Sequence, residues 1–507
     1  MRTLNSLKNA AGNLANSLIL NLLRFISRIV FVKVLSDVYL GVNGLLANVL
    51  GLLALAELGI GTAISYSLYK PLADKKEDNI LSLMKFYRKA YHVIAIIVLI
   101  LGLILLPFLP WFIKDTTGID NLSLIYLIFL FNMVIGYLFS YKRTLITADQ
   151  KNYKITPFLI FFNLLTTVLQ IIILLIFKDY ICYLLVQTVC ILLENVTVNT
   201  YINKCYPYLK NIKSAKPIKE DELDDIKINI KSLMLHRVGN YVLTATDNIV
   251  ISKFIGIVTV GIYSNYVLIH SAISNFIYMF VSNVTASFGN LIASGDKEKR
   301  YSVFKELNFM TFCLYGVSAI TLLFVFNPFI EFVFGTKFVL PFIVVLVIML
   351  NYYLTGINQV PIVVQTAAGV YKYDRYVPLI EAVLHLIISI ILAQYIGILG
   401  VLLGTFISYL LPLIIKPFVV FKYVFEKNVV NYFRSFVNQI LVLILSGFIV
   451  WVFVCFISFD SLFMQVLYNF IISLFVPTII IILFYHRTEE FIGSKDRIKF
   501  IFSKIRK

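Results

Sequence analysis

Long apolar runs follow one another along the whole chain, separated by short polar segments. Most runs reach the roughly 20 residues that an α-helix needs to cross the hydrocarbon core of a bilayer. Lipid offers no partner to backbone amides, so such runs are predicted to be helices, which satisfy their own hydrogen bonds. Apolar and polar residues do not alternate with period two, which argues against a membrane β-barrel. The pattern therefore predicts an all-α integral membrane protein.

The runs predict about 14 transmembrane helices, whose boundaries lie where polar residues begin. We place the spans at residues 13–34, 40–68, 88–113, 122–141, 155–177, 180–202, 232–252, 257–291, 306–328, 340–364, 376–396, 398–421, 436–458 and 463–485. The longest connecting segment, about 203–231, contains several lysines followed by the acidic run Glu220–Asp225. We interpret it as a solvated linker between two halves of the chain.

Composition narrows the class of protein further. Of the 507 residues, 60% are hydrophobic and 14% are charged, whereas soluble domains carry roughly 25% charged residues. The net charge of +17 does not indicate nucleic acid, because the basic residues lie between membrane spans and form no aromatic-interleaved patch in a soluble module. The five cysteines have no metal-site or disulfide spacing. We expect no nucleic-acid partner, no metal and no cofactor.

Charge also predicts the orientation of the chain. If the N-terminus is cytoplasmic, about 36 Lys and Arg residues fall in cytoplasmic segments and only about five in external ones. This asymmetry predicts a multi-pass protein with both termini in the cytoplasm. Residues 487–507 then form a basic cytoplasmic tail.

An internal repeat is indicated at an offset of about 219 residues. Residues 147–153 resemble residues 366–372, and Leu40-Gly41-Val42 resembles Val260-Gly261-Ile262. Six spans per repeat make the two repeats parallel, and we expect them to surround a central cavity. The predicted parts are an N-lobe (1–203), a cytoplasmic linker (204–231), a C-lobe (232–425), two additional C-terminal helices (426–486) and the tail (487–507).

Few charged residues lie within the predicted spans, and charges there are costly enough to mark functional sites. Arg24 and Arg28 are four residues apart and share one face of the first span. Arg237 lies about one turn into the seventh span, and Asn43 lies in the second. Guanidinium groups bind phosphate in a bidentate fork. We predict that these four residues bind an anionic substrate in the cavity. Three alternatives remain: Arg24 in a packing ion pair, Arg237 as an interfacial anchor, and Asn43 hydrogen-bonded only to neighbouring helices.

Three acidic residues are candidates for coupling or gating: Asp247, Glu57 and Glu194. Asp247 occupies the repeat position of Arg28, and we expect the two to approach in one conformational state and separate in another. Glu57 and Glu194 lie within the second and sixth spans, where a carboxyl group can carry H+ or bind Na+. The alternative for both is a structural role, paired with Arg24 or with a neighbouring helix.

No enzymatic motif emerges. The chain contains neither a GxxxxGK[ST] nucleotide loop nor an HExxH zinc motif. No soluble ATPase domain is predicted, so transport would be secondary. We expect a transporter that is not an enzyme.

Several short segments resemble the polysaccharide repeat-unit flippases of the Wzx type, within the multidrug/oligosaccharidyl-lipid/polysaccharide exporter superfamily. They are Leu58-Gly59-Ile60-Gly61-Thr62-Ala63, residues 247–256 with 260–264, Phe334-Gly335-Thr336-Lys337-Phe338 and Gly397-Ile398-Leu399-Gly400-Val401. The resemblance covers about residues 1–425.

The resemblance implies two lobes around a cationic cavity and a bacterial cytoplasmic membrane location. It implies that undecaprenyl-diphosphate-linked oligosaccharide moves from the cytoplasmic to the outer leaflet by alternating access, among membrane lipids and members of a polysaccharide-synthesis complex. In the related lipid II flippases, two further C-terminal helices shape a groove for the lipid tail. Three alternatives remain open: a cation-coupled multidrug or toxin antiporter of the same superfamily, a membrane glycosyltransferase or polymerase, and a non-transporting scaffold.

Overall fold

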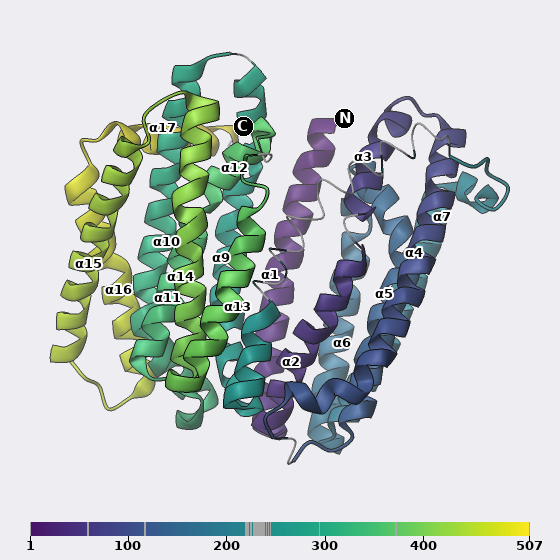
Figure 1. Cartoon of the computed structure of the whole chain (residues 1–507), viewed down its shortest axis with the longest axis horizontal. Coiled ribbons are helices and arrows are strands. Elements are labelled where there is room, and N and C mark those ends of the chain that lie inside the picture. Colours follow the sequence, from purple (N-terminus) through teal and green to yellow (C-terminus); the bar gives the residue numbers. More distant parts are fainter. Residues whose placement is uncertain are drawn as a thin grey trace. The chain divides into compact units, whose positions relative to one another are not determined.

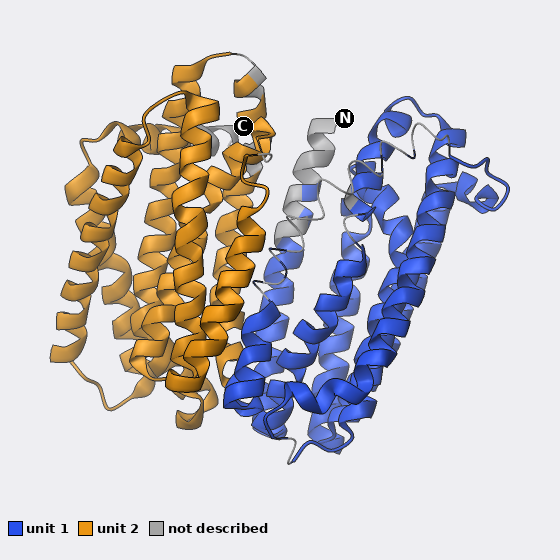
Figure 2. Cartoon of the chain, in the orientation of Figure 1, with its two compact units in different colours: residues 1–261 blue, residues 262–507 orange. Residues whose placement is uncertain are grey.

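The fold is described from a computed structural model of the chain (Figure 1). The structure describes residues 2–505 except 58–59, 116–117, 294, 371–372 and most of the segment 219–244, of which only 223, 226, 239, 241 and 243 are described. The described residues form two compact units, residues 1–261 and 262–507, coloured separately in Figure 2. Each unit is a bundle of long helices, and we describe each by itself.

The helices of the first unit overlap the predicted spans, although α1 and α4 each begin 11 residues earlier than predicted. They are α1 (Arg2–Val34), α2 (Asp37–Leu53), α3 (Ile60–Ala73), α4 (Glu77–Leu105), α5 (Leu122–Ala148), α6 (Thr156–Phe177) and α7 (Tyr180–Cys205). Short 3₁₀ turns connect them: η1 (Ala54–Glu57), η2 (Leu106–Phe112), η3 (Asn152–Lys154) and η4 (Pro207–Asn211). The π-helical turn η5 (Ile251–Ile255) precedes α9 (Ile257–Ala293), which continues into the second unit.

The second unit is built around one long helix, α10 (Lys297–Phe334). The remaining helices are α11 (Phe342–Ile357), α12 (Gln359–Ala368), α13 (Val377–Ile396), α14 (Ile398–Val420), α15 (Val430–Phe456), α16 (Leu462–Tyr485) and α17 (Glu489–Ile505). A 3₁₀ turn, η6 (Thr336–Phe338), follows α10, and a π-helical turn, η8 (Phe421–Phe425), follows α14. Helix α10 packs against α11, α15, α16 and α17, and much of its length is buried.

Twelve helices in the described part of the chain are long and apolar enough to cross a membrane. They correspond to twelve of the predicted spans. Of the other two, the predicted first span lies within α1, which does not count among the twelve, and the seventh, residues 232–252, lies largely outside the described residues. The all-α membrane fold is therefore confirmed, whereas the count of 14 stays a prediction.

Two spans predicted as single helices are interrupted. The second, residues 40–68, ends as α2 at Leu53, turns through η1 and restarts at Ile60 as α3. Gly59 and Gly61 weaken helix continuation there, because glycine costs about 1 kcal/mol relative to alanine in a helix. The tenth, residues 340–364, breaks between α11 and α12. Pro361 has no N–H to donate to the Ile357 carbonyl, and its ring clashes with that carbonyl group.

Helix starts in the two halves of the sequence recur at a nearly constant spacing. The helices α2, α4, α5, α6 and α7 begin at residues 37, 77, 122, 156 and 180, and α9, α10, α11, α13 and α14 at 257, 297, 342, 377 and 398. Gln150 and Gly369 both have a positive φ, as do Lys178 and Gly397, again 219 residues apart. This spacing supports the predicted internal repeat.

The C-terminal tail is helical over most of its length. The prediction of a basic tail from residue 487 missed α17, which packs against the N-terminal part of α10. Arg497 donates two hydrogen bonds to Glu306 at 2.8 and 2.7 Å, and Lys305 contacts Glu489 at 2.8 Å. Sequence patterns predicted the membrane spans but not these ion pairs, which hold α17 to the bundle.

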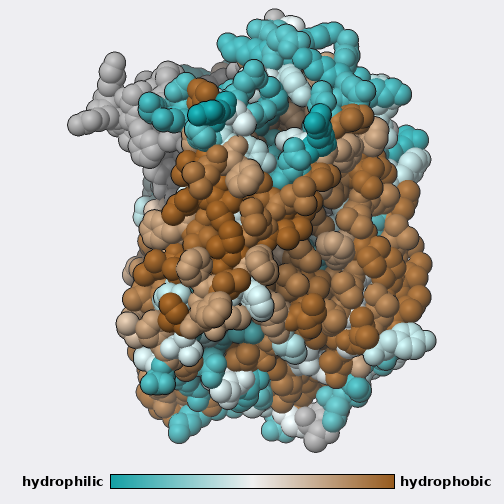
Figure 3. Space-filling model, turned by 90° about the vertical axis from the view of Figure 1, so that its left-hand side faces the viewer, coloured by the Kyte–Doolittle hydropathy of each residue, from teal (hydrophilic) through white to brown (hydrophobic). Residues whose placement is uncertain are grey.

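The apolar surface forms a band. On the face that carries α15 and α16, Figure 3 shows hydrophobic side chains across the middle and hydrophilic side chains gathered at the two ends. Large exposed apolar side chains recur along both helices, including Val437, Leu441 and Ile444 on α15. In a soluble protein such a surface would aggregate, whereas in a bilayer it contacts lipid tails.

Candidate functional site

The two predicted arginines of α1 lie on the side of that helix that faces the first unit. Arg24, Arg28 and Phe31 are spaced four and three residues apart, so they share one face. Phe31 is buried and packs edge to face against Tyr180 and Tyr183 of α7, with ring centroids 5.6 and 5.4 Å away. This contact identifies the inward face of α1.

The opposite face of α1 is apolar and exposed. Leu18, Leu22 and Ile26 recur at four-residue intervals and are 48%, 63% and 47% exposed. Arg24 is two residues from both Leu22 and Ile26, hence about 200° around the helix. Arg24 is nonetheless exposed, and it forms no ion pair with the described residues. The guanidinium group is thus directed away from the lipid-like stripe.

Arg28 lies in a tyrosine-rich environment, half-buried beside the phenol groups of Tyr180 and Tyr183. The Tyr180 hydroxyl is buried and has no hydrogen-bond partner among the described residues. Buried polar groups are nearly always hydrogen-bonded, so this hydroxyl calls for a water molecule or a polar ligand. The inward face of α1 therefore carries two cations, of which Arg28 lies beside an unsatisfied hydroxyl group of α7.

Glu57 ends the η1 turn and accepts a 2.6 Å hydrogen bond from the Tyr91 hydroxyl of α4. The ring of Tyr91 meets that of Tyr87 edge to face at 4.4 Å, and the Tyr87 hydroxyl is 2.8 Å from Thr144 Oγ1 on α5. The structure thus joins Glu57 to α4 and α5 through tyrosines. Glu57 is not paired with Arg24 in the described part of the chain, but it is bonded to the neighbouring helix α4, which is the other structural alternative for this residue.

Gly61 makes this polar cluster possible. A Cβ atom at Gly61 would lie 2.7 Å from Glu57 Oε1, 2.7 Å from the Tyr91 hydroxyl and 3.1 Å from the Tyr87 hydroxyl. The two separations of 2.7 Å are too short for a Cβ atom, so any other residue at this position would displace Glu57 or Tyr91. Gly61 belongs to the segment Leu58-Gly59-Ile60-Gly61-Thr62-Ala63, on which the family resemblance partly depends.

Glu194 is paired with a cation that the sequence did not bring to attention. Arg143 on α5 donates to Glu194 Oε1 at 2.7 Å and to Asn195 Oδ1 at 3.0 Å, both on α7. The predicted fourth span ends at residue 141, which assigns Arg143 to a cytoplasmic segment. Helix α5 continues to Ala148.

Two of the remaining predicted site residues lie in the described part of the chain. Asn43 is half-buried on α2, and Asp247 is half-buried on the helical segment before η5. Arg237 lies outside the described residues. The approach of Arg28 and Asp247 in one conformational state stays a hypothesis, and so do the binding and coupling roles assigned to all seven residues.

The second unit contains a buried ion pair that the sequence analysis missed. Lys416 Nζ on α14 is 3.3 Å from Asp374 Oδ2, whose side chain is 0% exposed. Glu381 on α13 is also buried and lies near Lys416. His385, one turn further along α13, contacts Thr405 Oγ1 at 3.1 Å. Lys416 lies within the predicted twelfth span, residues 398–421, and the sequence analysis does not single it out.

An apolar groove of about 630 Å³ lies in the second unit between α9, α10 and α16. On α10 its lining extends from Cys313 to Phe329, a run of roughly 24 Å at 1.5 Å per residue. That length approaches the thickness of a hydrocarbon core, about 30 Å. Phe491 of α17 lines one end.

The few hydroxyl groups in the groove lining are satisfied by backbone. Ser318 and Thr478 donate to carbonyl groups one turn back, and Thr321 donates to the Ser473 carbonyl at 3.0 Å. The last bond also attaches α16 to α10, as does a 2.9 Å bond from Asn469 to the Phe324 carbonyl. The groove therefore offers an apolar surface that suits an aliphatic chain and no partner for a polar molecule.

Comparisons with known proteins agree with this arrangement. The model of a family described as polysaccharide biosynthesis protein matches residues 6–286. A search of the curated proteins gives no match.

Solved structures with a similar fold are membrane transporters and flippases, not catalysts. The lipid II flippase MurJ in an inward closed conformation aligns with a TM-score of 0.65 at 14% identity, covering 92% of this chain and 99% of that one. An inward-facing multidrug resistance MATE family transporter of the MOP superfamily aligns with a TM-score of 0.60 at 13% identity, covering 81% and 97%. A MOP superfamily transporter from Pyrococcus furiosus aligns with a TM-score of 0.52 at 13% identity, covering 84% and 96%.

Proposed function

Because this chain belongs to the polysaccharide biosynthesis protein family, we propose that it is a flippase for undecaprenyl-diphosphate-linked polysaccharide repeat units. The cargo enters from the cytoplasmic leaflet of the bacterial cytoplasmic membrane and leaves to the outer leaflet by alternating access. Both termini are then cytoplasmic, and enzymes that build or polymerise the repeat unit are the expected neighbours.

The observation that carries the proposal is the apolar groove between α9, α10 and α16. A small cationic drug would not fill a groove roughly 24 Å long, and the hydroxyl groups of this groove are already hydrogen-bonded to the backbone. A polyprenyl tail suits the length and the apolar lining of the groove, and it must accompany its polar head across the bilayer. The tail would gain packing contacts there with little hydrophobic driving force, since it leaves lipid and not water.

Arg24 and Arg28 are the proposed diphosphate ligands, with Arg237 and Asn43 assisting. The inward face of α1 supports this role, because it presents two guanidinium groups away from the exposed stripe of Leu18, Leu22 and Ile26. Guanidinium stays charged in a low-dielectric site and matches phosphate oxygens in a bidentate fork. The unsatisfied Tyr180 hydroxyl beside Arg28 is a further donor for phosphate or sugar.

Glu57, Asp247 and Glu194 are the proposed coupling or gating residues, with H+ or Na+ as the ion. The Glu57–Tyr91 hydrogen bond and the adjoining Tyr87–Thr144 pair support Glu57 in particular. Protonation of Glu57 would weaken its hold on Tyr91 and change the contact of η1 with α4. The Arg143–Glu194 pair would respond in the same way to protonation of the carboxylate.

Transport of a fluorescent undecaprenyl-diphosphate oligosaccharide by the full-length protein in proteoliposomes tests the proposal. Arg24→Ala and Arg28→Ala should each slow exposure at the outer leaflet at least tenfold, since each removes a charge-assisted contact worth about 1.5–3 kcal/mol. Arg434→Ala, on the exposed face of α15, removes the same side chain and should transport normally. Equal rates in all three variants would remove the diphosphate-binding role, and export of cationic drugs would favour the antiporter alternative.

A further inference from the structure

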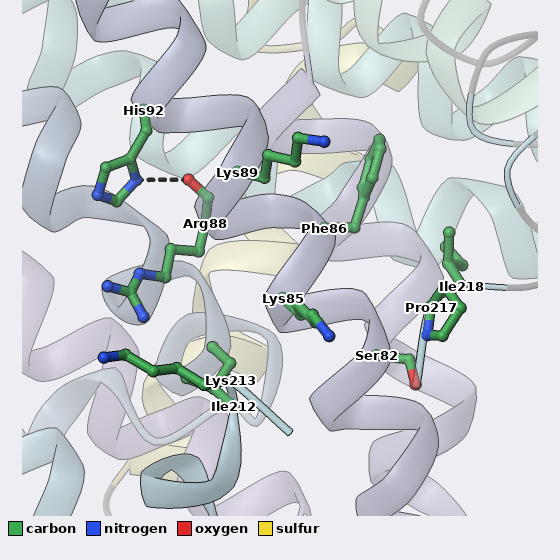
Figure 4. Close-up of a pocket in the computed structure, with 10 residues that line it drawn as sticks. All are labelled: Ser82, Lys85, Phe86, Arg88, Lys89, His92, Ile212, Lys213, Pro217 and Ile218. Atoms are coloured by element: carbon green, nitrogen blue, oxygen red, sulfur yellow. Dashed lines mark hydrogen bonds between the residues drawn. The ribbon is translucent and has the colours of Figure 1, made fainter. Parts of the chain in front are cut away.

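A second cavity, of about 600 Å³, lies in the first unit between the beginning of α4 and the segment that follows η4 (Figure 4). It is far in sequence from the groove and takes no part in the proposed transport sites. Its basic lining residues are Lys85, Arg88, Lys89 and His92 from α4 and Lys213 from the segment after η4. Figure 4 shows Arg88 and Lys213 extending their charged ends toward the same side, below His92.

Within the part of the chain that the structure describes, no acidic partner neutralises this cluster. Among the described residues, none of the five basic side chains forms an ion pair with a carboxylate. Lys142 of α5 lies near Arg88 and adds a further positive charge. Several cations that converge on one cavity repel one another, and an anion inside it would relieve that repulsion.

The cavity walls are ordered by contacts between α4 and the linker. Lys85 Nζ donates to the Ala215 carbonyl at 2.5 Å, and His92 Nδ1 is 2.6 Å from the Arg88 carbonyl. A carbonyl oxygen only accepts hydrogen bonds, so Nδ1 is the donor and Nε2 is left for another partner. Apolar side chains complete the lining, namely Phe86, Ile212, Pro217 and Ile218.

The corresponding place in the second unit is filled by the chain itself. With α4 beginning at residue 77 and α10 at residue 297, Lys85 corresponds to Lys305, Lys89 to Phe309 and His92 to Phe312. Lys305 is paired with Glu489 at 2.8 Å. The Phe309 ring lies 5.2 Å from Tyr485 and 6.2 Å from Phe491. An acidic and aromatic segment thus covers the position that, in the first unit, is an open basic cavity.

The occupant of the first-unit cavity should share these two properties, a negative charge and an apolar part. Helix α4 becomes apolar directly after His92, and Val93, Ile96 and Ile97 are exposed there. The cavity therefore lies where a lipid headgroup meets its acyl chains. Charge distribution predicts that this end of α4 faces the cytoplasm, and anionic lipids give that leaflet its negative surface potential.

We propose that this cavity binds the phosphate headgroup of an anionic membrane phospholipid, held by Arg88 and Lys213 and flanked by Lys85, Lys89 and His92. The lipid would join α4 to the segment that leads from the first unit to the second. The inference goes beyond the proposed function and holds whether or not the chain carries a lipid-linked sugar.

Binding of dihexanoyl phosphatidylglycerol to the full-length protein in non-ionic detergent, counted by native mass spectrometry, tests the inference. The variant Arg88→Gln/Lys213→Gln should bind this lipid about tenfold more weakly or worse, because two charge-assisted contacts are lost. Arg88→Lys/Lys213→Arg keeps both charges and should retain most of the affinity. Lys204→Gln/Lys210→Gln removes the same charge from two exposed positions that precede Lys213 in the chain and do not line the cavity, and this variant should bind within about twofold of the wild type.

Size-exclusion chromatography of each variant shows whether it is folded, and only folded variants are compared. Unchanged phosphatidylglycerol binding in Arg88→Gln/Lys213→Gln would overturn the proposal, as would equal binding of dihexanoyl phosphatidylcholine to the wild type. Inorganic diphosphate binding as tightly as the lipid would identify a site for soluble phosphate. Lipid binding that appears only after residues 220–225 are neutralised would show that the chain's own acidic run occupies the cavity, and would equally overturn it.

Discussion

Replacing Gly61 with alanine tests the polar cluster of the first unit. The new Cβ atom would lie 2.7 Å from both Glu57 Oε1 and the Tyr91 hydroxyl, which are themselves hydrogen-bonded at 2.6 Å. One of the two groups must move, and a hydrogen bond to a carboxylate contributes about 1.5–3 kcal/mol. The higher helix propensity of alanine stabilises α3 by at most about 1 kcal/mol relative to glycine. We expect the free energy of unfolding to fall by about 0.5–2 kcal/mol.

Gly136 provides a matched control for this substitution. It lies in α5, and a Cβ atom there meets nothing within 4 Å, so Gly136→Ala should leave stability unchanged or raise it by up to about 1 kcal/mol. Thermal unfolding in detergent, followed by the loss of monodisperse protein, gives the sign of each effect. Tyr91→Phe removes the same hydrogen bond without adding a Cβ atom. Fully additive effects of Gly61→Ala and Tyr91→Phe would refute the reasoning, because both substitutions should disrupt one interaction.

Three further predictions concern the second unit. Lys416→Met should destabilise the protein by about 3–5 kcal/mol in unfolding assays, since it leaves the buried carboxylate of Asp374 without its cation. Asp374→Asn should destabilise it less, because Glu381 remains near Lys416, and equal losses of stability would contradict the buried ion pair. The hydrogen bond and charge of Lys305 lower the pKa of Glu489, so the contact stabilises α17 fully at pH values above the usual glutamate pKa and is lost as the pH falls through the lowered pKa. The rate of hydrogen exchange in α17 should therefore rise below about pH 4, and in Glu489→Gln it should already be raised at neutral pH. Val317→Trp should block the groove and slow flipping at least tenfold, whereas Val437→Trp, on the exposed face of α15, should not; equal rates would exclude the groove from transport.

Sequence patterns predicted the membrane fold well because the cost of exposing polar backbone to lipid allows few solutions. Helix α6 was expected at residues 155–177 and lies at Thr156–Phe177, and α16 was expected at 463–485 and lies at Leu462–Tyr485. Hydropathy fails where a helix extends into the polar region, as α5 and α10 do, or breaks within a run, as between α2 and α3. Those features depend on glycine, proline and tertiary contacts, which hydropathy does not register.

The candidate sites were less predictable. The spacing of Arg24 and Arg28 was enough to place them on one face, but their direction needed Phe31 and its contacts with α7. The pairs Arg143–Glu194 and Lys416–Asp374 join residues 51 and 42 positions apart, and a single sequence contains no signal for such distant contacts. The basic residues of α4 were counted only as a topology signal, because their convergence on a cavity depends on where the chain after η4 packs.

Photocrosslinking of the lipid tail tests the central claim most directly. An undecaprenyl-diphosphate oligosaccharide with a diazirine in its tail is bound to the full-length protein in nanodiscs, irradiated, and the adducts are mapped by mass spectrometry. The account predicts adducts concentrated on the groove residues of α9, α10 and α16, such as Ile273, Val317 and Leu474, that are competed by unlabelled lipid-linked oligosaccharide. Adducts spread evenly over the exposed apolar surface, with Val437 and Ile444 of α15 labelled as strongly as the groove, would contradict it.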